Sequence, residues 1–387
     1  MLLLIKIMLT KMTRGGLGMR QLLKLKRNFL LLLLPLSLVL ILLARQSSDF
    51  AEFYALHIYK WISQFVSLIT GIIPLSLIEI IVLLLPIFLI FVLIRFIVRI
   101  VKETENRKSY ALKGIINIFC ALNILIFLFT LMGGLNYYRY PFSYYSNLEV
   151  RESSLDELYG MTNELAQKAN ELRSQISNLD ENGVFKLSMN NFKLAREVNK
   201  AMMNLSKEYP VLGGRYAAPK PIILSPLMSY TEITGVFMPF TMEANVNVDI
   251  SDYSIPATML HELAHQRGFM REDEANFISY LAGMSSDNIE IKYSSTMLAL
   301  IISGNALYGQ DKDLYFEIRD TYSDGIIKDI RANTEYWAKY EDTVVSTVST
   351  KINDTYLKAN AQVDGVKSYG RMVDLLLAKY RAELNKN

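Results

Sequence analysis

The sequence predicts a mainly α-helical protein, in which three transmembrane helices precede an extracytoplasmic α+β domain with a small sheet. Three observations support this prediction. Apolar residues are concentrated in the first third of the chain, positive charges are unevenly shared between the apolar runs, and the remainder reads as a water-soluble sequence rich in helical spacing. With 387 residues, the chain is long enough for two domains.

Three apolar runs, at residues 29–44, 75–94 and 114–133, are the candidate spans. The second and third have the length of about 20 residues that a hydrocarbon core of roughly 30 Å requires. The first run is shorter, but helix ends adjust to the bilayer. A cleavable signal peptide is its alternative interpretation. The following Arg45-Gln46 lacks a small-x-small cleavage pattern, which favours an uncleaved anchor.

The charges flanking these runs predict their orientation. The segment before the first run and the loop at residues 95–113 are rich in lysine and arginine, whereas the loop at residues 45–74 is balanced. Because positively charged loops stay in the cytoplasm, the N-terminus is expected inside and everything after Gly133 outside. Glu79 would be costly in lipid, so we expect it near the outer headgroups. The apolar stretch at residues 59–73 is expected in the outer interface or over the spans.

The soluble part is predicted to begin with helices. Ser154-x-x-Glu157 is a capping box that opens a helix over residues 153–177, and a second helix fits residues 190–207. A stretch rich in glycine and proline at residues 213–225 marks the start of a new unit. The predicted division is a cytoplasmic N-terminus (1–28), a three-span anchor (29–135), a helical extracytoplasmic segment (136–212) and a final domain with a helical C-terminal part (213–387).

Residues 243–250 alternate between apolar and polar side chains, which predicts a half-exposed strand. Asn245 and Asn247 would then face solvent. As an edge strand, this segment could bind an extended peptide by main-chain pairing. An ordinary sheet strand is an equally good interpretation.

The stretch HELAH at residues 261–265 is the principal candidate for chemistry, since it holds two of the three histidines of the chain. Residues four apart lie on one face of a helix, so His261 and His265 can offer two imidazole nitrogens to one metal ion, with Glu262 beside a bound water. Cys120 is the single cysteine, so any metal must be held by histidine and carboxylate ligands.

The third ligand is expected among the acidic residues that follow the motif. Glu274 begins a pattern with apolar residues three, four and seven positions later, so it should face inward, and it is favoured over Glu272. Two imidazoles, one carboxylate and an open position for water are typical of catalytic zinc. A structural or vacant site is the alternative.

If zinc (Zn²⁺) binds, Glu262 is expected to act as general base. Tyr293 is a candidate donor to the oxyanion, with a purely packing role as the alternative. Charged residues flank the motif, so the site belongs to the soluble part and not to the bilayer. A net charge of +3, without a basic stripe, argues against a nucleic-acid partner. The expected partners are the lipid bilayer and a peptide or protein substrate.

Four segments carry a resemblance to a known family: NYYRYP (136–141), PKPIILSPLMSYTEITGVFMPFTMEANVNVD (219–249), HELAHQRGFMREDEANFISYLA (261–282) and NDTYLKANAQVDGVKSYGRMVDLLL (353–377). They resemble an uncharacterised family of bacterial membrane proteins, catalogued as domain of unknown function 3810. The HExxH segment is similar to that of zinc metallopeptidases, which implies a zincin-like domain. The E-x-E-A-N segment resembles ImmA/IrrE-like peptidases, and their third zinc ligand corresponds to Glu274, although they place it farther from the second histidine.

Two functions follow as expectations. The first is a zinc metallopeptidase anchored in the bacterial cytoplasmic membrane that hydrolyses peptide bonds on the extracytoplasmic side. The second is a non-catalytic scaffold, assembly factor or sensor with a structural or degenerate HExxH site. The intact Glu262 favours the first, because metal binding alone does not require it. Tyr356, Asn360 and Tyr369 in the C-terminal block are expected to have structural roles.

Overall fold

The computed structural model describes residues 26–103, 105 and 107–385. Most of the predicted cytoplasmic N-terminus, residues 1–25, therefore lies outside the described residues. The chain divides into two compact units, one up to Leu43 together with Ile80–Leu131, the other Ala44–Glu79 together with Met132–Asn387. Residues 44–79, predicted as part of the anchor, thus belong to the unit that also holds the HELAH segment.

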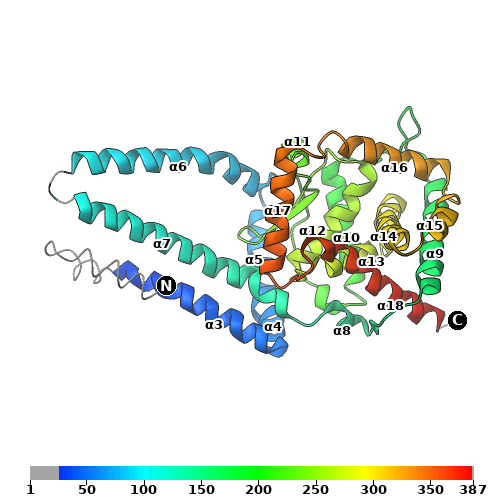
Figure 1. Ribbon diagram of the computed structural model, residues 1–387, viewed down its shortest axis with the longest axis horizontal. Coiled ribbons are helices and arrows are strands. Elements are labelled where there is room, and N and C mark those ends of the chain that lie inside the picture. The colour runs from blue at the N-terminus through cyan, green and yellow to red at the C-terminus, as the bar shows by residue number, and fades with distance from the viewer. Residues whose placement is uncertain (1–25, 104, 106, 386–387) are drawn as a thin grey trace. The chain divides into compact units, whose positions relative to one another are not determined.

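The first unit contains the apolar helices (Figure 1). In the part of the chain that the structure describes, three helices are long and apolar enough to cross a membrane. They are Arg27–Gln46 (its second part is α3, Leu33–Gln46), α6 (Leu77–Lys102) and α7 (Arg107–Met132). None of the side chains of α6 is buried among the described residues. A helix that is apolar on all sides needs an apolar surrounding, as a bilayer provides. The prediction of three apolar helices is confirmed.

The second unit is mainly helical. Its longer helices are α4 (Ser48–Tyr54), the π-helix η2 (Ala55–Tyr59), α5 (Lys60–Thr70), α9 (Leu155–Ser174), α10 (Asn191–Leu205), α12 (Ile255–Gln266), α13 (Glu272–Met284), α14 (Ile289–Gln310), α15 (Lys312–Arg319), α16 (Asp324–Trp337), α17 (Val344–Ala359) and α18 (Met372–Leu384). The remaining short helices of this unit are η3 (Gly134–Tyr138), α8 (Phe142–Ser146), η4 (Pro210–Leu212), α11 (Ser225–Ser229), η5 (Asp252–Ser254) and η6 (Gly365–Arg371).

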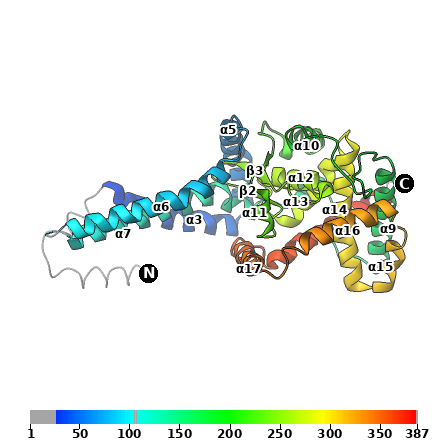
Figure 2. The ribbon, with the colours of Figure 1, turned by 90° about the horizontal axis from the view of Figure 1, so that it is seen from above.

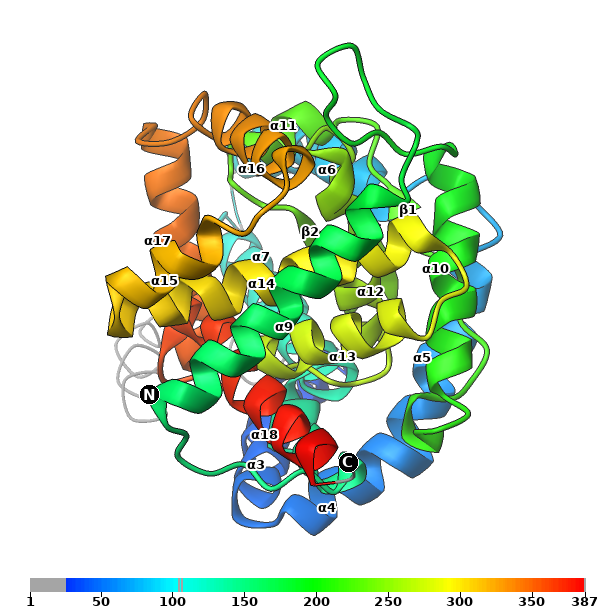
Figure 3. The same cartoon turned by 90° about the vertical axis from the view of Figure 1, so that its right-hand side faces the viewer.

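The predicted helix starts are confirmed. Ser154 and Glu157 form both hydrogen bonds of the capping box at the start of α9, and Asn190 caps α10. Helix α14 packs against α9 and also against α12 and α13 (Figure 3). Buried apolar side chains from all four helices form one continuous core. The HELAH helix α12 lies inside this core, which holds its backbone in a fixed position.

A small sheet, seen beside α12 in Figure 2, lies against that helix. Its order is β1 (Lys220–Pro221), β3 (Glu243–Val246), β2 (Gly235–Met238), with β1 parallel and β2 antiparallel to β3. The strand predicted at residues 243–250 is therefore central, which agrees with the interpretation as an ordinary sheet strand and not with the edge strand. The expectation that it is half exposed is wrong, because every residue of β3 is buried. Asn245 and Asn247 are fully buried, and their side-chain amides donate to backbone carbonyls of Val236 and Ile233.

Glu79, at the start of α6, is stabilised within the second unit. Its carboxylate accepts hydrogen bonds from the backbone N–H groups of Leu224 (2.6 Å) and Ile223 (3.3 Å). Two donors of this kind stabilise a carboxylate without a cation. This accounts for an acidic residue at the end of a long apolar run.

Candidate metal centre

The motif helix α12 ends at Gln266, two residues before a glycine. Gly268 has a positive φ of 86°, a conformation that favours glycine, and the Phe269 N–H bonds back to the carbonyl of Ala264. This turn reverses the chain, so that α13 begins at Glu272 and packs along α12. The reversal brings the acidic residues after the motif back toward its histidines.

Hydrogen bonds on the far side of each ring fix both histidines. The Nδ1 atom of His261 lies 2.7 Å from Oδ1 of Asn276, and Nδ1 of His265 lies 2.8 Å from the carbonyl oxygen of Phe269. The amide nitrogen of Asn276 donates to the carbonyl of Tyr369, which orients its oxygen toward His261. Both oxygens only accept, so each Nδ1 carries a proton and each ring turns its Nε2 atom toward the cavity.

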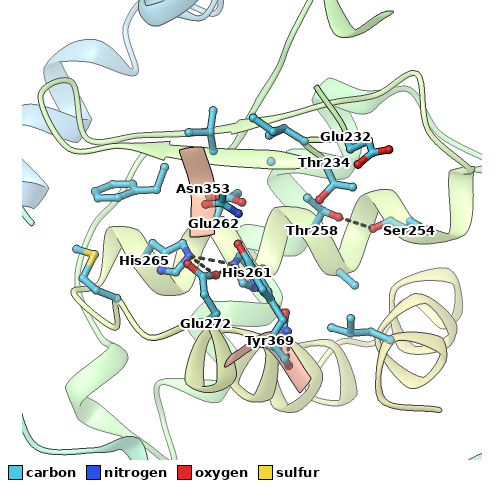
Figure 4. A pocket seen from close by; sticks show the side chains of 18 of the residues that line it. Glu232, Thr234, Ser254, Thr258, His261, Glu262, His265, Glu272, Asn353 and Tyr369 are labelled. Carbon is cyan, nitrogen blue, oxygen red and sulfur yellow. Dashed lines mark hydrogen bonds and ion pairs between the residues drawn. The ribbon is translucent and has the colours of Figure 1, made fainter. Parts of the chain in front are cut away.

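The Nε2 atoms of both histidines lie beside a carboxylate (Figure 4). The Nε2 atoms of His261 and His265 are 2.9 Å apart, and Oε2 of Glu272 lies 3.0 Å from the first and 3.4 Å from the second. All three side chains are buried. Two imidazole nitrogens and a carboxylate oxygen this close repel one another unless a proton or a metal cation lies among them. Two imidazoles and one carboxylate are a ligand set that fits zinc, and the outer hydrogen bonds to both rings are typical of metal-bound histidines.

In the cluster of His261, His265 and Glu272, protons on the histidines can take the place of a metal ion. Burial opposes charge on Glu272, but the positive charge of His265 and hydrogen bonds from both histidines hold the pKa of Glu272 well below its ordinary value. Burial opposes charge on His265 as well, and the carboxylate of Glu272 nevertheless raises the pKa of His265. Glu262 differs, because burial raises its pKa and the two histidines oppose this effect only in part. A raised carboxyl pKa suits a group that accepts and then releases a proton.

The structure places Glu274 outside this cluster. Its carboxylate accepts a hydrogen bond from the Phe142 N–H (2.7 Å) and pairs with Arg271 (2.5 Å). Helix α13 begins at Glu272, and two residues further on the chain has turned by about 200°. Glu274 therefore faces inward as predicted, but toward the core and away from the histidines. Of the two candidate ligands, the structure brings Glu272 to the histidines and not Glu274.

Tyr293 also lies apart from the cluster. Its hydroxyl donates to Oδ2 of Asp329 (2.7 Å), and the same carboxylate pairs with Arg173 (2.7 Å). Asp329 and Tyr293 are fully buried. The hydroxyl hydrogen is thus committed to a buried ion pair, so the geometry opposes the role of oxyanion donor and supports the alternative of packing.

We expect Tyr293→Phe to lower the free energy of unfolding by about 1–3 kcal/mol, because Asp329 loses a buried donor. The change should appear as a lower midpoint of thermal unfolding, with zinc content unaltered. A variant that kept its unfolding midpoint but lost zinc or activity would instead assign Tyr293 a role in the metal site.

A cavity of about 700 Å³ opens beside the cluster. The motif residues line it together with β2, and Leu298, Ile301 and Ile302 of α14 add an apolar wall. Tyr356 and Tyr369, expected to be structural, also line it. The Tyr369 ring lies over that of His261, with centroids 6.2 Å apart. Burial, and after it the negative charge of Glu272 and a hydrogen bond with that carboxylate, raises the pKa of Tyr369 well above its ordinary value, so its hydroxyl stays protonated beside the cluster.

Asn276 is a further residue that the motif did not indicate. Replacing Asn276 by alanine removes the acceptor that orients His261, and we expect zinc affinity to fall by about 10- to 100-fold. A competition titration against a fluorescent chelator measures this change. Asn276→Asp, which keeps an acceptor, should lose less, and equal losses in the two variants would contradict the orienting role.

Among known proteins, the chain matches one family model. No curated protein and no solved structure matches the chain. Residues 54–377, which include the whole cluster and the cavity lining, match the family described as "Protein of unknown function (DUF3810)". The chain belongs to this family.

Proposed function

We propose that this protein is a membrane-anchored, zinc-dependent peptidase whose second unit lies outside the cytoplasm. The observation that carries the proposal is the convergence of His261, His265 and Glu272 beside Glu262 in an open cavity. Structural zinc sites are normally closed by a fourth protein ligand, whereas catalytic sites keep an open position. Among the described residues, the group of candidate ligands has three members.

Glu262 is the proposed general base. A bound zinc ion would polarise the scissile carbonyl and lower the pKa of a water molecule. Oε2 of Glu262 is buried and has no hydrogen-bond partner among the described atoms, so it is available to take a proton and pass it to the leaving amine. A Cβ at Gly235 would collide with Oε1 of Glu262, so the glycine allows β2 to lie directly against this carboxylate.

Tyr369 is the proposed donor to the oxyanion. Its ring lies over His261, and its hydroxyl stays protonated for the reason given above. A neutral hydroxyl held in a buried site stabilises developing negative charge better than a solvated one. This role replaces the one expected of Tyr293.

The cavity supports an extended peptide as substrate. Strand β2 pairs with β3 on one side, and among the described residues its other edge is unpaired and lines the cavity. The main chain of a peptide can add to such an edge. Across the cavity, Leu298, Ile301 and Ile302 are partly exposed and offer an apolar surface. We therefore expect cleavage next to a bulky apolar residue.

A peptide library tests the proposal. Full-length protein, reconstituted in lipid vesicles, is incubated with the library before and after zinc is stripped and restored. Cleavage that requires zinc, with an apolar residue at a fixed position from the cut, would support the peptidase. A protein that binds one zinc per chain and cleaves nothing would support the scaffold or sensor instead.

A further inference from the structure

The helical segment Ser48–Thr70, formed by α4, η2 and α5, has its polarity reversed relative to an ordinary surface helix. The face of its second half that packs against the protein carries Tyr59, Ser63, Ser67 and Thr70, all buried. The opposite face carries large apolar side chains exposed to the surroundings: Phe53, Ile58, Trp61, Phe65, Leu68, Ile69 and, just beyond the helix, Ile72. The exposed fraction reaches 66% for Trp61, 68% for Phe65 and 79% for Ile72.

Hydrogen bonds prevent this segment from turning its apolar face inward. The Tyr59 hydroxyl donates to the carbonyls of His265 and Gln266 (3.3 Å each), and Ser63 donates to the carbonyl of Gln266 (3.2 Å). The Gln266 side-chain amide in turn donates to Ser67 (2.9 Å). The polar face is therefore fastened to the last residues of α12, and His265 is itself one of the cluster histidines.

We propose that this apolar face is seated in the membrane–water interface, in contact with lipid. Soluble proteins seldom expose a contiguous row of large apolar side chains. Both ends of the segment join apolar helices by short connections: one residue separates Gln46 from Ser48, and α6 begins at Leu77 after α5 ends at Thr70. The seven Cα steps from Thr70 to Leu77 span at most about 25 Å, so chain connectivity keeps the face near the point where α6 begins.

The side chains themselves suit this location. Trp61 belongs to the exposed row, and tryptophan is enriched at membrane interfaces because its ring is apolar and its N–H is polar. An amphipathic helix binds an interface through buried apolar area. The segment thus fastens the end of α12 directly to the lipid surface, whether or not the cluster hydrolyses peptides.

Tryptophan fluorescence tests this inference, since the chain has two tryptophans, Trp61 and Trp337. Full-length Trp337→Phe is reconstituted in phosphatidylcholine vesicles whose acyl chains carry bromine near the headgroup end. We expect brominated lipid to quench most of the Trp61 emission. In the matched Trp61→Phe variant, Trp337 on α16 should respond to aqueous iodide and not to brominated lipid.

Two results would overturn the inference. Quenching of Trp61 by iodide alone would place the face in water. Quenching by neither reagent would mean that protein covers it, such as a second copy of the chain. If Trp337→Phe fails to fold, the difference between the emission of the wild type and of Trp61→Phe reports on Trp61.

Discussion

Glu272→Ala is expected to weaken zinc binding by more than about 100-fold, since loss of a mere supporting hydrogen bond to a ligand already costs about 10- to 100-fold. The reason is geometric. Glu272 supplies the one carboxylate of the cluster, 3.0 Å from the Nε2 atom of His261. Zinc per chain, measured by mass spectrometry after dialysis of the full-length protein against buffered zinc, should fall from one to near zero.

Glu274→Gln is the matched control, because the two glutamates lie on the same turn of α13. Glu274 bonds to the Phe142 N–H and Arg271, so its replacement should lower thermal stability and leave zinc content at one per chain. The opposite pattern, with zinc lost in the Glu274 variant and retained in Glu272→Ala, would refute the arrangement of ligands described above.

Glu272 and Glu274 show which part of the site could be predicted from the sequence and which part could not. Helical spacing placed Glu274 on the inward face of α13, and it is buried. Glu274 nevertheless lies away from the histidines, because α13 has two buried sides, one toward the core and one toward α12. Glu272 and Asn276 are four residues apart and share the side toward the histidines. This i, i+4 pair was the available signal, but only the turn at Gly268 determines which side meets the motif.

Features that depend on local chemistry were predictable. The capping box at Ser154, the helix end at Gly268 and the three apolar helices all follow from short stretches of sequence. The burial of Asn245 could not be predicted from a short stretch of sequence, because its polar side chain is satisfied by a backbone carbonyl of a neighbouring strand. The position of Tyr369 could not be predicted either. This residue is more than a hundred positions from His261 in the sequence and lies over it only through the packing of η6.

Replacing Glu262 is expected to lower the rate of peptide hydrolysis. We expect Glu262→Gln to lower kcat for peptide hydrolysis by about 10²- to 10⁴-fold, the range that general acid–base catalysis contributes. Glutamine has the same shape as glutamate but cannot take a proton at neutral pH. Because Glu262 is not a member of the ligand group, zinc content should remain at one per chain. Parallel measurements of zinc and of the rate on one cleaved peptide check both halves of the prediction.

Glu232→Gln supplies the comparison within the same cavity. Glu232 is an exposed carboxylate at the cavity rim, and Figure 4 shows it well apart from the histidines that adjoin Glu262. Removing its charge should therefore preserve most of the rate, which separates proton transfer from a general change in the charge of the cavity. If Glu262→Gln kept the wild-type rate while removal of zinc abolished it, another group would take the proton, and the role assigned to Glu262 would be wrong.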